Sequence, residues 1–288
     1  RVARLVEADQ QRGGEHIAGA GRVALGSRER ADLVWLAFEI QGCAQRAARH
    51  NHEPAVLGIA QGQRLVAQSL QEAVARARQA RGCDLMYLGQ LENLSLETPS
   101  YLKEAEERGD EFELTNLRTQ ITPILCLMRD EPAAAHLEVS QTMGKWPMKE
   151  FDLQHLQAML SMVQIDLYEG NALTAYQRLQ ASQSRFRWSL IPYAIKLIRC
   201  QNFDSLGRVA LAAAAVQPAR AKKLRGEALT MAKRLTTEEG NGWSDALAWL
   251  LRASVAALRG DKDEAMTLLR RALADLARND MALHVAAA

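Results

Sequence analysis

This chain of 288 residues has no long apolar run, few aromatic residues and no large excess of positive or negative charge. No segment approaches the roughly 18 consecutive apolar residues that a membrane-spanning helix needs, so we expect no membrane partner. Lys and Arg number 36 against 34 Asp and Glu, and this balance gives no overall attraction to nucleic acid or to an anionic membrane. Aromatic residues make up 5%, beside 18 Gly and 7 Pro, a composition that favours helices over a β-sandwich or barrel.

Cysteine is also scarce. The four cysteines lie far apart, at Cys43, Cys83, Cys126 and Cys200. They form no C-x-x-C motif, which is typical of free thiols in a reducing compartment. The chain has no apolar signal segment and begins at Arg1 rather than Met. We therefore expect a cytoplasmic fragment cut from a longer polypeptide.

Motifs for catalysis or for cofactor binding are absent from the sequence. The glycines between Gly13 and Gly26 do not form a G-x-x-x-x-G-K-[S/T] loop, and no apolar strand precedes them. The kinase motifs H-R-D and D-F-G are missing as well. Cys43, His50 and His52 lack a fourth ligand at a spacing that suits zinc, and the histidines are interpreted as part of a solvated turn. We predict no catalytic, cofactor-binding or metal-binding residue in this chain.

A dense acidic run lies between Glu104 and Glu113, with Lys103 and Arg108 interleaved. Paired carboxylates perform acid–base chemistry only in a cleft that is poor in water. The high local charge predicts a solvated helix face instead.

One segment has features of an RNA-binding surface. Arg185-Phe186-Arg187-Trp188 alternates cations with aromatics, as helical proteins do when they hold phosphates and stack bases. On a helix, however, we expect Phe186 and Trp188 in the core with the arginines extended over them. Nucleic acid is therefore the disfavoured partner.

The segment Trp249–Leu273 predicts a helix–turn–helix unit of the tetratricopeptide type. Trp249 is expected to open the first helix with Ser244 as its cap, and Gly260 to end it. Asp261 is expected to cap the second helix in a capping-box-like start. The small and apolar residues at the repeat offsets are Ala253, Ala256, Ala265, Leu269, Ala272 and Leu273. Since one such pair cannot bury its apolar face alone, the unit implies neighbours in a stacked array.

The same register recurs upstream. The matching alanines Ala135, Ala175, Ala221 and Ala265 are separated by 40, 46 and 44 residues. A standard unit has about 34 residues, so these helices are expected to be longer. Gly89 predicts a fifth unit whose second helix kinks at Pro99.

Helix boundaries follow from local signals in these units. Phe112–Met128 is predicted as one helix, and Phe203–Val216 as an alanine-rich helix interrupted by Pro218. Asn171 is expected to cap the helix that follows Gly170.

The predicted fold is therefore all-α, a right-handed α-solenoid of about five tetratricopeptide-like helix pairs with longer-than-standard helices. Residues 83–288 are expected to form the array, and residues 1–82 irregular N-terminal helical repeats continuous with it. Within the first part, Ala31–Arg49 and Leu65–Arg81 are amphipathic helices.

The inner face of such an array is its usual recognition surface, so polar residues expected there are candidates for contact with a protein partner. These candidates are Asn116, Arg118, Gln120, Gln157, Gln164 and Tyr168. A methionine-rich stripe at Met143, Met148, Met159 and Met162 is interpreted as packing between helices.

Several segments together carry a resemblance to a known family. They are Glu104–Asp110, Thr115–Arg118, Ile165–Gly170, Arg208–Ala215, Trp243–Gly260 and Asp280–Leu283. Over residues 80–288 the chain resembles the C-terminal helical-repeat region of large multidomain bacterial serine/threonine protein kinases of the myxobacterial type. In that family a kinase domain and a signal-transduction ATPase module precede the repeats.

The resemblance implies a regulatory or sensor scaffold that is not itself an enzyme. Its partner would be the upstream kinase and ATPase domains of the same polypeptide, or another protein. The catalytic and nucleotide-binding residues of that family lie upstream, so none corresponds to a residue here. The alternatives are the repeat domain of a transcription regulator, a stand-alone adaptor, and an RNA-binding solenoid.

Overall fold

The computed structural model describes residues 74–147, 151–189, 191–238 and 242–288. The chain divides into two compact units, Arg1–Ala73 and Val74–Ala288, and every described residue belongs to the second. The predictions made for residues 1–73, including Cys43, His50 and His52, lie outside the described residues. The predicted boundary at residue 82 lies inside a helix over residues 74–87.

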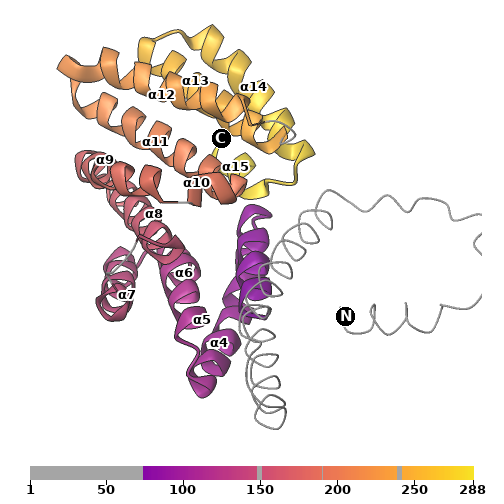
Figure 1. The fold of residues 1–288 in the computed structure, drawn as a ribbon. Coiled ribbons are helices and arrows are strands. Elements are labelled where there is room, and N and C mark those ends of the chain that lie inside the picture. The colour runs from indigo at the N-terminus through magenta and orange to yellow at the C-terminus, as the bar shows by residue number, and fades with distance from the viewer. Residues whose placement is uncertain (1–73, 148–150, 190, 239–241) are drawn as a thin grey trace, which may run out of the picture. The chain divides into compact units, whose positions relative to one another are not determined.

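Helices are the only regular structure in these four described ranges, which confirms the all-α prediction there (Figure 1). After the helix over residues 74–87 come α4 (Leu91–Arg108), α5 (Glu111–Asn116), a π-helical turn η1 (Leu117–Ile121), α6 (Thr122–Met128), α7 (Pro132–Lys145), α8 (Leu153–Tyr168), α9 (Ala172–Trp188), α10 (Ile191–Ala194), α11 (Lys196–Val216), a 3-10 turn η2 (Pro218–Arg220), α12 (Ala221–Thr236), α13 (Gly242–Arg259), α14 (Lys262–Arg278) and α15 (Ala282–Ala287). None of the described helices is long and apolar enough to cross a membrane.

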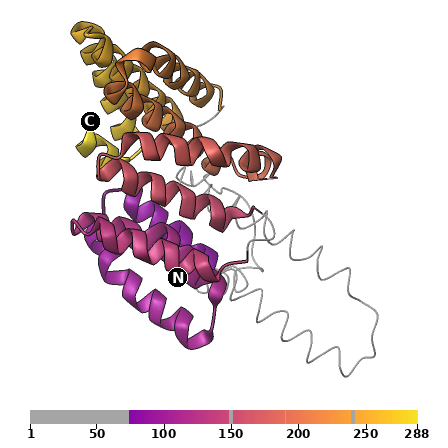
Figure 2. The ribbon, with the colours of Figure 1, turned by 90° about the vertical axis from the view of Figure 1, so that its left-hand side faces the viewer.

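Helices that follow one another in the sequence pack against one another (Figure 2). The packed pairs include α6 with α7, α8 with α9, α11 with α12, and α13 with α14, and contacts of α9 with α11 and of α12 with α13 connect successive pairs. The first helices of these pairs also touch in order, α6 with α8, α8 with α11, and α11 with α13. Buried Val163, Leu179 and Val209, from α8, α9 and α11, share one cluster, so the apolar core continues from one pair to the next.

A common turn ends several of these helices. Gly260 has a positive φ of 84°, and the N–H of Asp261 donates to the carbonyl of Ala256 at 3.0 Å. This bond satisfies a carbonyl that the helix end would otherwise leave open, and it requires a left-handed residue, for which glycine has no steric cost. The same bond pattern and a positive φ occur at Gly89, Gly109, Asp130, Gly170 and Asp280.

Two of the predicted helix starts are correct in position. The carboxylate of Asp261 accepts the N–H of Glu264 at 3.1 Å, which confirms the predicted cap of α14. Asn171 does precede α9, but its side-chain amide donates to Glu169 at 3.2 Å and caps nothing.

The predicted start of α13 is wrong. This helix begins at Gly242, so Trp249 lies in its middle and Ser244 lies within its first turns instead of capping it. The physical reason is that the apolar face extends further upstream, where Ala246 and Leu247 are fully buried.

The helix predicted over Phe112–Met128 is continuous but contains the π-helical turn η1. Pro123 follows that turn; it has no N–H, and its ring crowds the carbonyl of Thr119, four residues earlier. A wider turn relieves this conflict. The hydroxyl of Ser161 on α8 donates to the Thr119 carbonyl at 2.6 Å, so the released acceptor is satisfied by the neighbouring helix.

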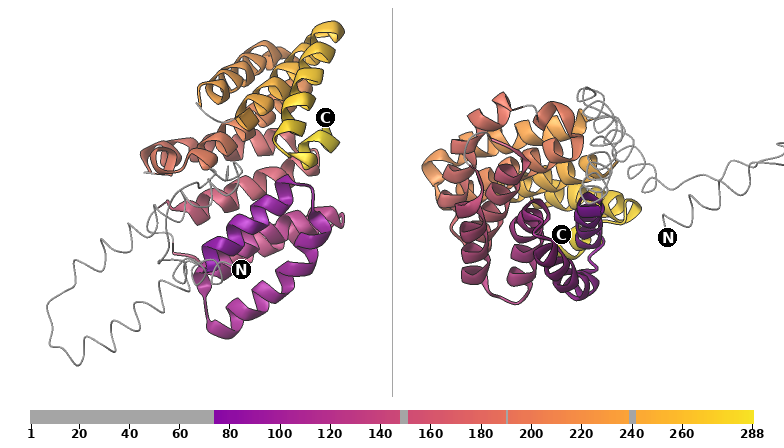
Figure 3. Two further views of the ribbon diagram at one scale, coloured as in Figure 1. Left: turned by 90° about the vertical axis from the view of Figure 1, so that its right-hand side faces the viewer. Right: turned by 60° about the horizontal axis from the view of Figure 1, so that its bottom comes forward.

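The last helix returns to the beginning of this unit, where α15 lies beside the helix over residues 74–87 (Figure 3). A Cβ atom on Gly89 would come within 3.3 Å of the backbone nitrogen of Leu283, so the two segments are closely packed. Nearby, the Tyr87 hydroxyl accepts a hydrogen bond of 2.8 Å from the Gln201 amide of α11.

Candidate functional site

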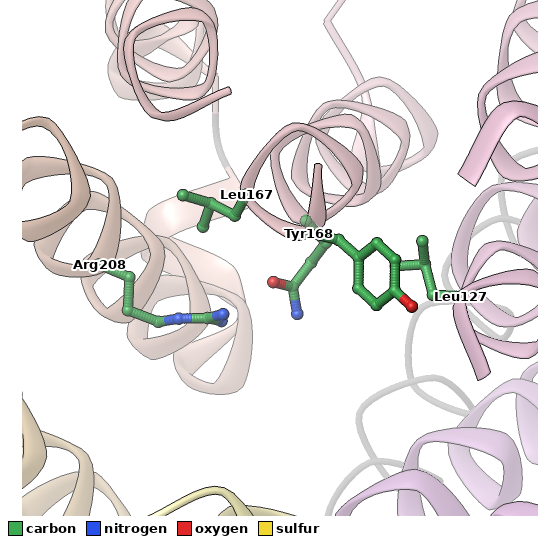
Figure 4. A pocket seen from close by; sticks show the side chains of 5 residues that line it. Leu127, Leu167, Tyr168 and Arg208 are labelled. Atoms are coloured by element: carbon green, nitrogen blue, oxygen red, sulfur yellow. The ribbon is translucent and has the colours of Figure 1, made fainter. Parts of the chain in front are cut away.

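A pocket of about 250 Å³ lies between three of the helices that touch in order. It is lined by Leu127 of α6, by Gln164, Leu167 and Tyr168 of α8, and by Arg208 of α11. Arg208 extends from α11 toward the pocket, with Tyr168 on the opposite side (Figure 4). Two of the six residues selected from the sequence, Gln164 and Tyr168, therefore meet at one place.

Arg208 is the charged residue of this lining. Its ion pair within the described part of the chain is with Asp204, one helical turn earlier, at a long 3.9 Å. Burial raises the pKa of the Asp204 carboxyl, and the charge of Arg208 lowers it by less. At 3.9 Å the two side chains form no direct hydrogen bond, so Asp204 leaves the N–H donors of Arg208 unused.

Tyr168 is 49% exposed, and it contributes its ring to the pocket lining while its hydroxyl is engaged elsewhere. That hydroxyl donates to the Asp130 carboxylate at 2.7 Å. This hydrogen bond, more than burial, raises the pKa of Tyr168. Asp130 itself stands at the left-handed turn after α6, so the turn helps to hold the ring in place.

Asn116 and Gln157 are interior groups, although both were selected as surface contacts. The Asn116 carbonyl oxygen accepts a bond of 3.0 Å from the amide of Gln154, between α5 and α8. The Asn116 amide nitrogen and the Gln157 amide oxygen are buried without a hydrogen-bond partner among the described residues. Neither side chain is accessible to a partner protein in this arrangement of the helices.

Arg118 and Gln120 are engaged in contacts within the unit. Arg118 forms ion pairs with Glu106 and, at 3.3 Å, with Glu138. Gln120 accepts a bond of 2.8 Å from Gln79 and donates to the Cys83 sulfur at 3.0 Å. These two side chains therefore link neighbouring helices and lie apart from the pocket lining.

Burial governs the chemistry of the described cysteines, Cys83, Cys126 and Cys200, which are all free thiols. Burial raises the pKa of Cys83 to about 12 and that of Cys200 to about 11, so both are protonated at neutral pH. No group of three or more His, Cys, Asp or Glu side chains within the four described ranges could hold a metal ion.

The solvated helix face predicted for the acidic run between Glu104 and Glu113 is only partly correct. Glu113 is only 1% exposed, and its carboxylate accepts hydrogen bonds from Arg78 at 3.0 Å and from Arg108. The expectation of a solvated face is therefore wrong for Glu113, because two arginines compensate a buried carboxylate. The reason is tertiary: Arg78 comes from the helix before α4.

The prediction that both Phe186 and Trp188, at the end of α9, lie in the core is also only half correct. Phe186 is buried as predicted, whereas Trp188 is 90% exposed. Trp188 is the last residue of its helix, so it extends beyond the neighbours that would cover it.

Arg208 and Asp204 are the functional candidates that sequence reasoning missed. The available signal was a pair of opposite charges four residues apart, directly before the alanine-rich end of α11. Since Lys196 and Arg199 lie on the same helix, only the structure shows that Arg208 borders a pocket.

No protein-family model matches this sequence, and no curated protein or solved structure has a significant similarity to it.

Proposed function

We propose that residues 74–288 form a right-handed solenoid of tetratricopeptide-like helix pairs that serves as a regulatory scaffold for protein contacts. The observation that carries this proposal is the ordered contact of α6, α8, α11 and α13, each of which is paired with the next helix in the sequence. Repeated pairs of this kind build an extended surface from units that depend on their neighbours. Three of the four pairs, α6–α7, α8–α9 and α13–α14, are joined by the same left-handed turn, at Asp130, Gly170 and Gly260, which supports the assignment of repeats.

We propose further that this scaffold belongs to a bacterial serine/threonine kinase–ATPase polypeptide, as the sequence resemblance implies. Contacts on the scaffold would shift the activity of upstream domains, which amounts to a coupling free energy between two sites. The close packing of α15 on the start of the unit supports this role. A rearrangement of the helix pairs that lie between these two segments in the sequence would alter that contact.

The coding sequence around this segment gives the first test, and a kinase domain and a P-loop upstream are the expected result. Deletion of residues 74–288 from that polypeptide is then expected to change autophosphorylation or ATP hydrolysis. Arg270→Gln, a change at an exposed position on α14, serves as the control and is expected to leave both activities unchanged. Equal output from the intact and deleted proteins, with and without partner, would show the proposal to be wrong.

RNA binding is the second candidate, favoured by the exposure of Trp188 beside Arg185 and Arg187. An exposed indole next to cations suits the stacking of an unpaired base. This function requires binding that falls steeply with salt and that weakens on charge reversal at Arg220, Lys222 and Lys223, all exposed near the start of α12. Salt-independent or absent binding of single-stranded RNA would exclude it.

A further inference from the structure

The pocket between α6, α8 and α11 combines an apolar wall with a single cation. Leu127 and Leu167 supply aliphatic surface, and Tyr168 supplies an aromatic ring. Gln164 adds an amide that can donate or accept, and Arg208 adds a guanidinium with five N–H donors. The lining is therefore mixed, and convergent polar groups beside aliphatic and aromatic surface can fix the orientation of a small ligand.

Arg208 differs in its hydrogen bonding from Arg178 and Arg199, the arginines of α9 and α11 that pair directly with a carboxylate. Arg178 donates to Asp166 at 2.7 Å, and Arg199 donates to Glu238 at 2.6 Å. Arg208 lies 3.9 Å from Asp204, beyond hydrogen-bond distance, and donates to no acceptor among the described residues. Its donors are therefore free to bind an anion at the pocket.

The surrounding acids limit the charge of that anion. Asp204 lies near Arg208, and Asp130 holds the hydroxyl of Tyr168 at the opposite wall. One cation between two acidic side chains suits a ligand with one negative charge, because a second charge would be repelled by Asp130. A polyanion such as a nucleotide does not fit this pattern.

We propose that this pocket binds the carboxylate of an organic acid that carries a short apolar chain. The carboxylate pairs with the Arg208 guanidinium, in the bidentate geometry that this side chain favours, and Gln164 donates its amide N–H to the same group. The chain lies against Leu127, Leu167 and the ring of Tyr168. Since the cavity of about 250 Å³ is small for a ligand site, the chain has only a few carbons.

Two sources share this chemistry, a free monocarboxylic acid and the C-terminal carboxylate of a peptide that ends in an apolar residue. Isothermal titration of the 288-residue chain distinguishes them with hexanoate and with acetyl-Ala-Leu-Leu, each beside its uncharged amide. At least one acid is expected to bind saturably and about tenfold or more tightly than its amide, because a charge-assisted pair is lost in the amide. The acid that binds identifies the source.

Arg208→Gln is expected to weaken binding of that acid by about tenfold or more and to leave the amide unchanged, since only the charged pair is removed. Arg270→Gln, the matched control at an exposed position on α14, is expected to bind like the native chain. Tyr168→Ala removes the aromatic wall and is expected to weaken acid and amide alike. Thermal unfolding of each variant verifies that it is folded, and Arg208 is exposed enough for the substitution to be tolerated.

Failure of both acids to bind would overturn the proposal. Equal binding of acid and amide, or unchanged acid binding by a folded Arg208→Gln variant, would overturn it as well. The proposal is tested independently of the regulatory role above, because the titration measures no kinase or ATPase activity and the deletion experiment adds no carboxylate ligand.

Discussion

The ring of Tyr87 stacks on the imidazole of His284, with ring centroids 5.6 Å apart and planes inclined by 13°. This stack joins the first described helix to the last helix, α15. The Nδ1 atom of His284 is buried and has no hydrogen-bond partner in the described part of the chain. Burial, with a smaller effect from the charge of Arg208, lowers the pKa of His284 to about 4. The stack therefore holds a neutral imidazole.

The free energy of unfolding is expected to fall as pH decreases from 6.5 to about 4, between the pKa values of His284 in the unfolded and the folded chain. Its pKa is about 4 when folded and near the ordinary 6.5 when unfolded, so between these values the unfolded chain binds more protons. Native protein is therefore expected to lose unfolding free energy between pH 6.5 and pH 4 relative to His284→Phe, which keeps a stacked ring without a titrating group.

Urea unfolding of both proteins across this pH range measures the difference. The raised pKa of Asp204 acts in the opposite direction. Its carboxyl binds a proton more readily in the folded chain than in the unfolded chain, so it increases the free energy of unfolding as pH falls. That contribution is common to both proteins and largely cancels. Parallel pH profiles would contradict the assignment of a buried neutral imidazole.

Gly207 and Gly226 are expected to respond in opposite ways to alanine. A Cβ atom on Gly207 in α11 would lie 2.5 Å from Leu251 of α13, where two first helices of adjacent pairs cross. Overpacking there is expected to cost about 1–3 kcal/mol. Gly226 in α12 has open space around it, so Gly226→Ala is expected to gain about 0.5–1 kcal/mol of helix stability. Chemical denaturation compares the two variants, and equal effects would show that α11 and α13 are not in close contact.

The sequence is sufficient to predict features that arise locally. Helix ends at Gly170 and Gly260 follow from glycine at a left-handed turn, and the cap at Asp261 follows from its spacing to Glu264. Helical periodicity likewise predicts the buried face of α7, where Ala135 and Val139 are nearly inaccessible. Each signal lies within one turn of the residue that it describes.

Features that depend on distant residues could not be predicted in this way. Glu113 is paired in the interior with Arg78 of another helix, and Arg208 borders a pocket only because residues of α6 and α8 lie beside α11. The interior position of Asn116 depends on Gln154 of α8. A pattern of polar residues along one helix gives no information about a partner elsewhere in the chain.

Removal of the buried Glu113 carboxylate is expected to be destabilising. Glu113→Ala removes an acceptor that Arg78 and Arg108 share, while Glu104 still pairs with both, so the loss of these charge-assisted hydrogen bonds is expected to cost about 1.5–3 kcal/mol. Glu111→Ala is the matched control, since it also removes an acid from the first turn of α5 but at an exposed position. Thermal unfolding is expected to separate the two variants clearly. A loss of stability for Glu113→Ala no larger than for Glu111→Ala would contradict the assignment of a buried ion-pair network.

The hydroxyl of Ser161 is expected to stabilise the fold only while Pro123 leaves the Thr119 carbonyl without its backbone hydrogen bond in the helix. Ser161→Ala leaves that carbonyl without its partner at 2.6 Å, at a cost of about 1–3 kcal/mol. In a Pro123→Ala background, the introduced alanine brings the missing N–H, so the helix can satisfy the carbonyl itself and Ser161→Ala is expected to cost less than about 1 kcal/mol. Denaturant unfolding of the native protein, the two single variants and the double variant gives the coupling free energy. Additive effects would mean that the hydroxyl of Ser161 does not compensate for the proline, and that the π-helical turn η1 has another cause.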